Sequence, residues 1–173
     1  YVKKIQELGF NVDEGKIFTS GEATSIYLKS HTKYQRIFLV GTQALETEFI
    51  NDGFVLTKKE PEAVVLGFDT TLTYEKIWKA CDLIREGLPY YATHPDFNCP
   101  TETGFMTDIG SFIAMIETST GRKPDVIIGK PYRHIVDAVV NKTGYAIEDI
   151  AMIGDRLYTD IALGKAGIKT ILV

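Results

Sequence analysis

Two aspartates stand close together in the stretch GDRLYTD, directly after a short apolar run. Gly154 lets the backbone turn sharply at the end of that run, so Asp155 is expected at the carboxyl edge of a strand. Asp160 is expected in the first turn of the next helix, which Thr159 would cap, with its carboxylate folded back toward Asp155. Carboxylates completed by waters suit Mg²⁺, and open α/β sheets bind their ligands at such an edge. The pair therefore predicts a magnesium site. The alternative is that both acids only stabilise the N-terminus of the helix and bind no ligand.

A lysine follows a second apolar run of the same kind, in the stretch DVIIGKP. Lys130 comes directly after Gly129, and Pro131 is expected in the first turn of the following helix. A fixed ammonium group beside clustered carboxylates would hold them in place and offset the negative charge of a phosphate. A lone lysine after a strand is usually a solvated surface residue. Together with Asp155 and Asp160, however, Lys130 predicts a magnesium-dependent phosphoryl-transfer site.

Short apolar runs alternate with helix-period stretches along most of the chain, and they indicate the elements that would position these side chains. Runs that are apolar throughout and separated by helices are typical of buried parallel strands with crossover helices, so the predicted class is α/β. The predicted strands are Arg36–Gly41, Ala63–Phe68, Pro89–Thr93, Asp125–Gly129, Ile150–Gly154 and Lys169–Val173. The predicted helices are Tyr1–Leu8, Glu22–Leu28, Gln43–Asn51, Tyr74–Glu86, Asp108–Thr118, Tyr132–Lys142 and Thr159–Lys165.

Two irregular stretches suggest a division of the chain into two units. SHTKYQ at 30–35 is polar, and PTETGFMTD at 100–108 has few core-type residues, so both are expected to be loops. Residues 31–120 would then form a separate small α/β unit, and residues 1–30 and 121–173 would belong to one core. The chain opens inside a helix and closes on a bare apolar strand, whereas a doubly wound sheet usually continues with a covering helix. We therefore expect the chain to be part of a longer protein.

Composition excludes several classes of function. The chain has 173 residues, of which 45% are hydrophobic and 24% are charged, so a globular fold is expected rather than disorder. A formal net charge of −4 argues against nucleic acid as the main partner, because phosphate-binding surfaces need a basic excess. The apolar runs are too short to span a bilayer and the N-terminus does not read as a secretory signal, so no membrane partner is expected. Two cysteines in no metal or disulfide pattern favour a reducing, cytoplasmic location.

The stretch IGKP and the later stretch MIGDRLYTD resemble motifs III and IV of the haloacid dehalogenase (HAD) superfamily of phosphatases. Four further stretches resemble its NagD-like, p-nitrophenyl phosphatase-like branch (subfamily IIA), namely ELGFNVDEGKIFTSGEAT, VVLGFDTTLTYEKI, ATHPDFNCP and IETSTGRKPDVIIGKP. The resemblance covers essentially the whole chain. It implies a Rossmann-like parallel-sheet HAD core, which is partial here, with an inserted α/β cap domain over residues 31–120.

The resemblance also implies roles for individual residues. Lys130 resembles the motif III lysine, which steadies the nucleophile and the phosphoryl group. Asp155 resembles the motif IV acid that binds Mg²⁺ directly, and Asp160 resembles the second acid of that motif, which supports the metal site from behind Asp155. Both residues are therefore assigned to the metal site, and Asp160 is also assigned to catalysis. Asp96 and Asn98 in THPDFNCP resemble the cap loop that reaches over the site and helps to select the substrate, although such loops are also simple surface turns.

The activity implied by the resemblance is Mg²⁺-dependent hydrolysis of small phosphorylated metabolites through an aspartyl-phosphate intermediate. The family's nucleophile is the first aspartate of an Asp-x-Asp-Gly-Thr/Val motif, and neither that motif nor motif II is present in this sequence. Asp69 follows an apolar run but lacks the second aspartate and the glycine of that motif, so a strand-end or helix-capping role is favoured for it. The nucleophile is therefore expected outside these residues, in a protein longer by about 90 residues. The branch also makes a homodimer through the cap an expectation.

A non-catalytic HAD-fold binding or regulatory domain that lost the nucleophile is the alternative function, and the absence of motif I supports it directly. It is disfavoured because loss of motifs I and II together would remove a central pair of strands and expose the core of the sheet. A dinucleotide-binding oxidoreductase is excluded, since no Gly-x-Gly-x-x-Gly follows a predicted strand.

Overall fold

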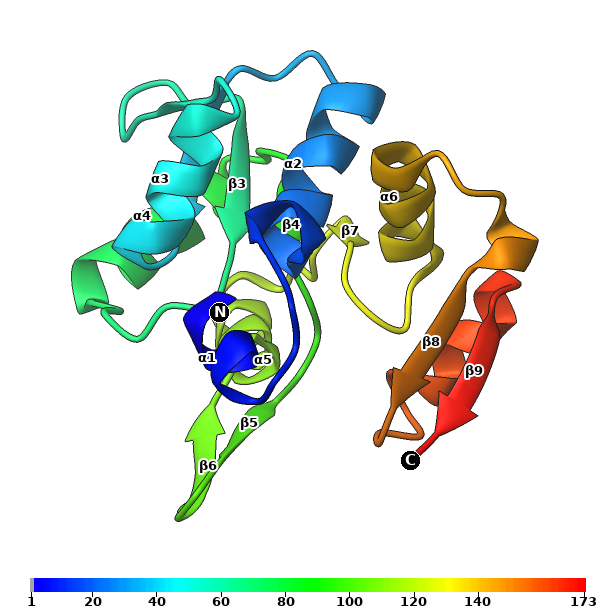
Figure 1. Cartoon of the computed structure of the whole chain (residues 1–173). Helices are drawn as coiled ribbons and strands as arrows, with labels where there is room; N and C mark the ends of the chain where they lie inside the picture. Colours follow the sequence, from blue (N-terminus) through cyan, green and yellow to red (C-terminus); the bar gives the residue numbers. More distant parts are fainter. Residues whose placement is uncertain (1) are drawn as a thin grey trace.

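The computed structural model describes residues 2–173 and is built around a five-stranded parallel sheet (Figure 1). The order of the strands is β2-β1-β3-β4-β7, and every neighbouring pair is parallel. The bounds are Arg36–Val40 for β1, Val55–Leu56 for β2, Ala63–Leu66 for β3, Tyr90–Ala92 for β4 and Val126–Ile127 for β7. The order changes direction between β1 and β3, so the loops after these two strands flank the switch point of the sheet.

The predicted α-helices are confirmed except for the last one. The α-helices are α1 (Val2–Glu7), α2 (Ser20–His31), α3 (Gln43–Asn51), α4 (Tyr74–Arg85), α5 (Ile109–Thr120) and α6 (Arg133–Thr143). Tyr1, which begins the predicted N-terminal helix, lies outside the described residues. Thr19, Thr42 and Thr73 cap α2, α3 and α4, because each hydroxyl accepts a hydrogen bond from the N–H three residues further on. Among residues 2–173, no helix has both the length and the apolar character needed to cross a membrane.

Helices cover both faces of the five-stranded sheet. Alternate strand side chains face opposite sides, so Phe38 and Val64 pack with α4 and α5, whereas Ile37 and Val65 pack with α2, α3 and α6. All four of these strand side chains are buried. Strands that are buried on both faces need apolar residues at every position, which is the pattern that predicts them in the sequence. The predicted α/β class with a parallel sheet is therefore confirmed.

A second, two-stranded parallel sheet lies at the C-terminal end of the chain, apart from the first sheet (Figure 1). Its strands are β8 (Ala151–Gly154) and β9 (Lys169–Leu172), joined by a 3₁₀ helix, η3 (Ile161–Ala166). The predicted helix over this last segment is thus a 3₁₀ helix that begins later than expected. A small cluster of buried side chains packs η3 against α6. Two shorter 3₁₀ turns, η1 (Glu14–Lys16) and η2 (Ile147–Asp149), lie in other connections.

The prediction of an irregular connection at 100–108 is wrong. β5 (Asn98–Thr101) and β6 (Gly104–Thr107) form an antiparallel hairpin there. Every β6 side chain is exposed and so are most of those in β5, so no buried face imposes the alternating pattern that would reveal the strands. Pro100 also argues against a strand in the sequence, because proline has no N–H to donate. Both strands of a two-stranded hairpin are edge strands, however, where proline is tolerated. The other expected loop, at 30–35, begins only after His31, where α2 ends.

The predicted division of the chain, with residues 31–120 as a cap and 1–30 and 121–173 as a core, stays a prediction. The five-stranded sheet extends beyond 31–120, because β7 pairs with β4 and α2 packs on the same sheet through Ala23 and Leu28. Within the described residues, β8 and β9 pair with each other and not with the larger sheet.

Candidate active site

Lys130 leaves the five-stranded sheet just after β7, beside the end of β4. The N–H of Gly129 donates a hydrogen bond to the carbonyl oxygen of Thr93 at 2.8 Å, which ties the two strand ends together. A Cβ at Gly129 would lie 2.6 Å from that oxygen, so glycine is needed for the two backbones to come this close. The Lys130 side chain is 37% exposed, and its Nζ pairs with Oδ1 of Asp160. The sheet therefore positions the lysine, and tertiary packing brings it to the acid.

Asp160 is buried, and both of its carboxylate oxygens are engaged. Oδ1 contacts Lys130 Nζ, and Oδ2 accepts a hydrogen bond from the backbone N–H of Arg156 at 3.2 Å. The carboxyl group also lies directly against Gly154, where any side chain would collide with it. A buried carboxylate needs a partner of opposite charge, and Lys130 supplies it. The expected proximity of Lys130 and Asp160 is confirmed, whereas their roles stay predictions.

Three expectations about the neighbouring helices are wrong. Thr159 does not act as a cap, because its Oγ1 is buried without a hydrogen-bond partner among residues 2–173. Asp160 itself occupies the N-cap position of η3, but its side chain makes no capping hydrogen bond, since both oxygens are engaged elsewhere. Pro131 lies before α6, which begins at Arg133, and not in its first turn. Side-chain capping therefore does not explain Asp160.

Asp155 follows β8 directly, at the carboxyl end of the strand, as the sequence predicts. It is exposed. No hydrogen bond or ion pair joins its side chain to another residue in the described part of the chain, so its oxygens are open to a cation or to water. The structure thus joins Lys130 to Asp160 and leaves Asp155 at the end of β8 without a bond to either.

The donor chemistry of these two acids fits Mg²⁺. This ion is usually held by one or two carboxylates together with waters and substrate phosphate oxygens. Asp155 offers free oxygens for direct binding, whereas Asp160 is committed to Lys130 and Arg156 and fits a supporting place behind the ion. The two acids therefore fit the different roles that the family resemblance implies, which are direct metal binding for Asp155 and support of the metal site for Asp160.

Asp96 lies in the loop between β4 and the hairpin, and Asn98 is the first residue of β5. The structure brings Asp96 to Arg156. Asp96 Oδ2 accepts a hydrogen bond from Arg156 Nη1 at 3.4 Å, and the two side chains are 18% and 25% exposed. Asp96 Oδ1 is buried without a partner among residues 2–173. Sequence reasoning misses Arg156, although its position directly after Asp155 is a signal that could find it.

A pocket of about 510 Å³, here called the Arg156 pocket, lies between two parts of the chain. One part is this loop with the hairpin, and the other is formed by the residues near Asp160. Its lining includes Asp96, Asn98, Phe105, Pro131, Arg156 and Tyr158. Its volume lies within the range of small-molecule sites, and it combines aromatic walls with a few polar groups. Asp96 and Asn98 therefore share one pocket, next to the residues that follow Lys130 and Asp155.

A second group of possible metal ligands, which sequence reasoning misses, lies near this pocket. His94, Asp96 and Asp108 each offer one ligand atom, and these atoms all lie within 4.8 Å of one another. No spacing in the sequence signals the group, because the hairpin separates Asp108 from the other two. A histidine with two carboxylates suits Zn²⁺ better than Mg²⁺, so this group does not replace Asp155 as the magnesium candidate.

Asp69, the other acid at a strand end, is fully engaged. Its Oδ1 accepts hydrogen bonds from the N–H and Oγ1 of Thr71 at 2.8 and 2.6 Å, and its Oδ2 pairs with Lys76 Nζ at 2.6 Å. These contacts give Asp69 a structural place in the loop between β3 and α4, and its strand-end role stays a prediction. Helix capping is not its role, because Thr73 caps α4.

Comparisons with known proteins identify the family. The model for haloacid dehalogenase-like hydrolases matches residues 1–55, and the model for HAD-hydrolase-like proteins matches residues 127–173. A solved structure assigned as NagD is 50% identical with a TM-score of 0.95, over 99% of this chain and 68% of its own. The chain therefore belongs to the haloacid dehalogenase-like hydrolases.

Its place within the family is the NagD-like branch, as the sequence motifs predict. A dihydroxyacetone phosphatase from Corynebacterium glutamicum is 36% identical over 98% of this chain and 62% of its own length. A glycerol phosphate phosphatase from Mycobacterium tuberculosis, solved in complex with calcium, is 29% identical with a TM-score of 0.90, over 99% of this chain and 52% of its own. The chain spans 62% to 66% of the length of the curated relatives that it matches. These relatives are named as phosphatases and, in one case, as a 5'-nucleotidase, which does not favour the non-catalytic alternative.

Proposed function

We propose that the protein to which this chain belongs is a phosphatase that hydrolyses small phosphorylated metabolites with Mg²⁺. The observation that carries the proposal is the contact of Lys130 with the buried carboxylate of Asp160, beside a strand end that presents the free carboxylate of Asp155. A fixed ammonium group next to an open carboxylate is what the binding of a phosphoryl group and a cation requires.

Each of these residues has a separate part in the proposed reaction. The Lys130 ammonium holds the nucleophile and the phosphoryl oxygens, and Asp160 keeps that ammonium in place. Asp155 binds the cation, and the relative solved with calcium supports a divalent ion in this family. When bound, Mg²⁺ neutralises negative charge on the phosphoryl oxygens. The nucleophile is an aspartate outside these residues, which forms an aspartyl-phosphate that water then hydrolyses.

Substrate selection is assigned to Asp96 and Asn98, because both line the Arg156 pocket. This pocket would hold the part of the substrate that is not phosphate, with the cap domain as the unit that carries the loop. The proposal also includes a homodimer formed through the cap, the absence of nucleic-acid and membrane partners, and a cytoplasmic location. They rest on the resemblance and on the composition, and the two cysteines are free in the structure.

Hydrolysis of p-nitrophenyl phosphate by the full-length protein tests this function. We expect turnover with Mg²⁺ and its loss in EDTA. Asp155→Asn should lower kcat by roughly 100-fold, because an amide oxygen carries no charge to hold the cation, and added Mg²⁺ should restore part of the rate. Asp137→Asn changes an exposed acid on α6 and is the matched control, expected to keep full activity. Equal turnover of the Asp155 and Asp137 variants would contradict the proposal.

A further inference from the structure

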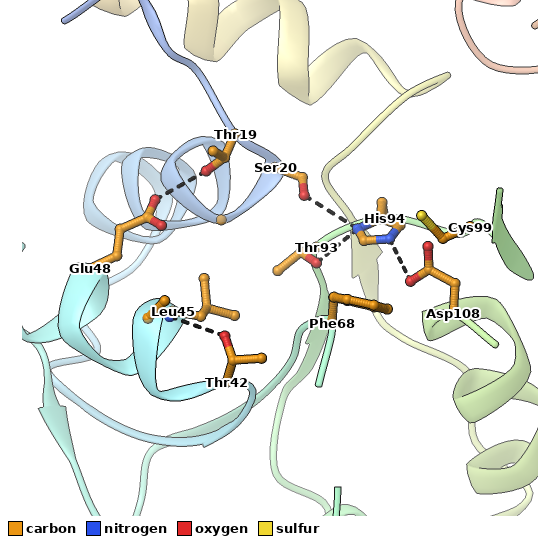
Figure 2. A pocket seen from close by; sticks show the side chains of 12 residues that line it. Thr19, Ser20, Thr42, Leu45, Glu48, Phe68, Thr93, His94, Cys99 and Asp108 are labelled. Atoms are coloured by element: carbon orange, nitrogen blue, oxygen red, sulfur yellow. Dashed lines mark hydrogen bonds and ion pairs between the residues drawn. The ribbon is translucent and has the colours of Figure 1, made fainter. Parts of the chain in front are cut away.

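A second pocket, of about 310 Å³, lies at the switch point of the five-stranded sheet (Figure 2). Thr42 lines it from the loop after β1, Phe68 from the loop after β3, and His94 from the loop after β4. The carboxyl ends of three neighbouring parallel strands therefore surround this switch-point pocket, at the place where doubly wound sheets bind their ligands. None of the residues assigned to phosphoryl transfer lines it.

A serine, a histidine and an aspartate form a continuous hydrogen-bond chain on the wall of this pocket (Figure 2). Ser20 Oγ lies 3.3 Å from His94 Nδ1, and His94 Nε2 lies 2.9 Å from Asp108 Oδ1. The ionised carboxylate of Asp108 only accepts hydrogen bonds, so His94 carries its proton on Nε2 and leaves Nδ1 to accept one from a hydroxyl. A histidine in this tautomer, held by an acid and in contact with a serine, is a general base beside a nucleophile.

Of the two hydroxyls that lie near His94 Nδ1 among residues 2–173, that of Ser20 is the more accessible to a ligand. Thr93 Oγ1 also lies near His94 Nδ1, at 3.1 Å, but Thr93 is only 2% exposed. Both residues line the pocket, but Ser20 is only half-buried and is therefore more open to it than Thr93. The His94 and Asp108 side chains are 18% and 8% exposed, so packing holds the ring in the orientation that points Nδ1 at Ser20.

The N-terminus of α2 adds donors for a negative oxygen. Ser20 is the first residue of this helix, and Thr19, Ser20 and Gly21 all line the pocket. The first N–H groups of a helix have no partner inside it. Thr19 Oγ1 accepts the N–H of Glu22 at 3.0 Å, which leaves the N–H groups of Ser20 and Gly21. The N–H of a nucleophile and that of the next residue are common donors to the oxyanion in acyl transfer.

We propose that Ser20, His94 and Asp108 form a second catalytic site, which hydrolyses small carboxylic esters. Ser20 Oγ attacks the ester carbonyl carbon while His94 Nδ1 takes its proton, and the carbonyl electron pair moves to the oxygen near the helix N-terminus. The bond to the alcohol then breaks, and the alcohol leaves with the proton from His94. Leu45 and Phe68 give the pocket an apolar wall for a short acyl group.

Water completes the reaction and restores the enzyme. It attacks the acyl carbon on Ser20 and gives one proton to His94 Nδ1. The bond between Ser20 Oγ and the acyl carbon breaks, Ser20 recovers the proton from His94, and the carboxylic acid leaves. The net reaction converts one ester and one water into one acid and one alcohol, with no metal or other reactant.

Hydrolysis of p-nitrophenyl acetate and butyrate by the full-length protein in EDTA tests this site. We expect turnover above that of free imidazole, and an acetyl adduct in the intact-mass spectrum that peptide mapping places on Ser20. Ser20→Ala should lower kcat/KM by roughly 10³-fold and abolish the acetyl adduct. Ser25→Ala changes a buried serine of the same helix whose Oγ has no partner among residues 2–173, and it is the matched control, expected to keep the activity.

Further variants separate catalysis from folding. Asp108→Asn should lower kcat because a neutral amide does not stabilise the imidazolium that forms when His94 takes the proton, although an asparagine oxygen still caps α5 through the N–H of Ile109. Ser20→Cys should still form the acyl adduct, since a thiol is also a nucleophile. Thr93→Val should keep ester hydrolysis, because the proposal gives Thr93 no part in it.

Three results would overturn the proposal. The first is equal ester hydrolysis by Ser20→Ala and Ser25→Ala. The second is an acyl adduct on Cys99, which also lines the pocket, instead of on Ser20. The third is activity that disappears in EDTA and returns with Zn²⁺, which would assign a metal to His94, Asp96 and Asp108 instead. The phosphatase assay needs Mg²⁺ and the ester assay excludes it, so failure of one function is distinct from failure of the other.

Discussion

Two acids at strand ends differ in the single property that matters for metal binding, which is the availability of their oxygens. Asp69 is 3% exposed, and its two carboxylate oxygens are bonded to Thr71 and Lys76. Asp155 is exposed and makes no hydrogen bond or ion pair with the rest of the described chain. Both are aspartates that follow an apolar run in the sequence, so the side-chain partners distinguish the structural acid from the candidate ligand.

Lys130 also has a structural role, because it neutralises the buried Asp160. Lys130→Met should leave this carboxylate without a charged partner and lower the free energy of unfolding by about 2 kcal/mol, less than for a fully buried pair because Lys130 is 37% exposed. Urea denaturation of the parent and the variant measures this change.

The matched control for this variant is Arg133→Met, which breaks the exposed pair of Arg133 with Asp137. It should change stability by less than about 0.5 kcal/mol, since exposed ion pairs contribute little. If the two variants unfold at the same urea concentration, Lys130 does not stabilise Asp160 as described.

At the level of elements, the junction of β4 and β7 depends on the absence of a side chain at Gly129. A Cβ there would lie 2.6 Å from the carbonyl oxygen of Thr93, which is backbone and cannot rotate away. Gly129→Ala should therefore destabilise the protein by about 1–3 kcal/mol and displace Lys130, lowering phosphatase activity as well. Thermal unfolding and turnover of p-nitrophenyl phosphate measure the two effects.

Gly15→Ala is the control for Gly129→Ala, because a Cβ at Gly15 would approach only the Asp13 side chain within residues 2–173, and that side chain can move. It should stay within about 0.5 kcal/mol of the parent. An unchanged melting temperature for Gly129→Ala would show that β4 and β7 can separate at no cost.

The contact of α2 with α6 makes stability depend on pH through His134. The Tyr27 ring lies 4.3 Å from that of His31 and 4.8 Å from that of His134, measured between centroids. Burial lowers the pKa of His134 below its ordinary value of 6.5, Asp137 opposes this shift and His31 adds to it. As pH falls, the unfolded chain then binds the proton first, so stability is full above about pH 6.5 and is lost as pH falls toward the pKa of the folded state.

His134→Gln should remove this part of the pH dependence. We expect the urea midpoint of the parent to fall between about pH 7 and pH 5 by more than that of the variant. Denaturation curves at several pH values in one buffer series measure the difference. Parallel pH dependence in the two proteins would mean that His134 titrates as it does in the unfolded chain.

For the molecule as a whole, the two sheets should differ in stability. The five-stranded sheet has fully buried residues such as Val40 and Val64, whereas Ile153 and Ile171 in the two-stranded sheet are 61% and 49% exposed. In the 173-residue chain, the amides of β1 and β3 should exchange hydrogen at least about 100-fold more slowly than those of β8 and β9, because local opening costs less where little apolar surface is buried. Equal exchange rates would mean that the chain unfolds as one cooperative unit.

Much of the fold can be predicted from the sequence, because burial leaves a local pattern. Strands covered on both faces are apolar throughout, so the runs that contain β1, β3, β4 and β7 are visible in the sequence. The runs that contain β8 and β9 are apolar and visible as well, although most of their side chains are exposed in the structure. The positions of Lys130 and Asp155 after two such runs follow in the same way. The hairpin of β5 and β6 is invisible because it buries almost nothing, and its residues need no apolar order.

The partners of the functional side chains follow from the tertiary structure alone. Lys130 and Asp160 are 30 positions apart, Asp96 and Arg156 are 60 apart, and Ser20 and His94 are 74 apart. Whether such residues meet depends on the order of strands in the sheet and on the paths of the loops between them. No short stretch of sequence encodes either of these, since both result from the packing of the whole chain. The chemistry of each residue is therefore local, and the sites they form are not.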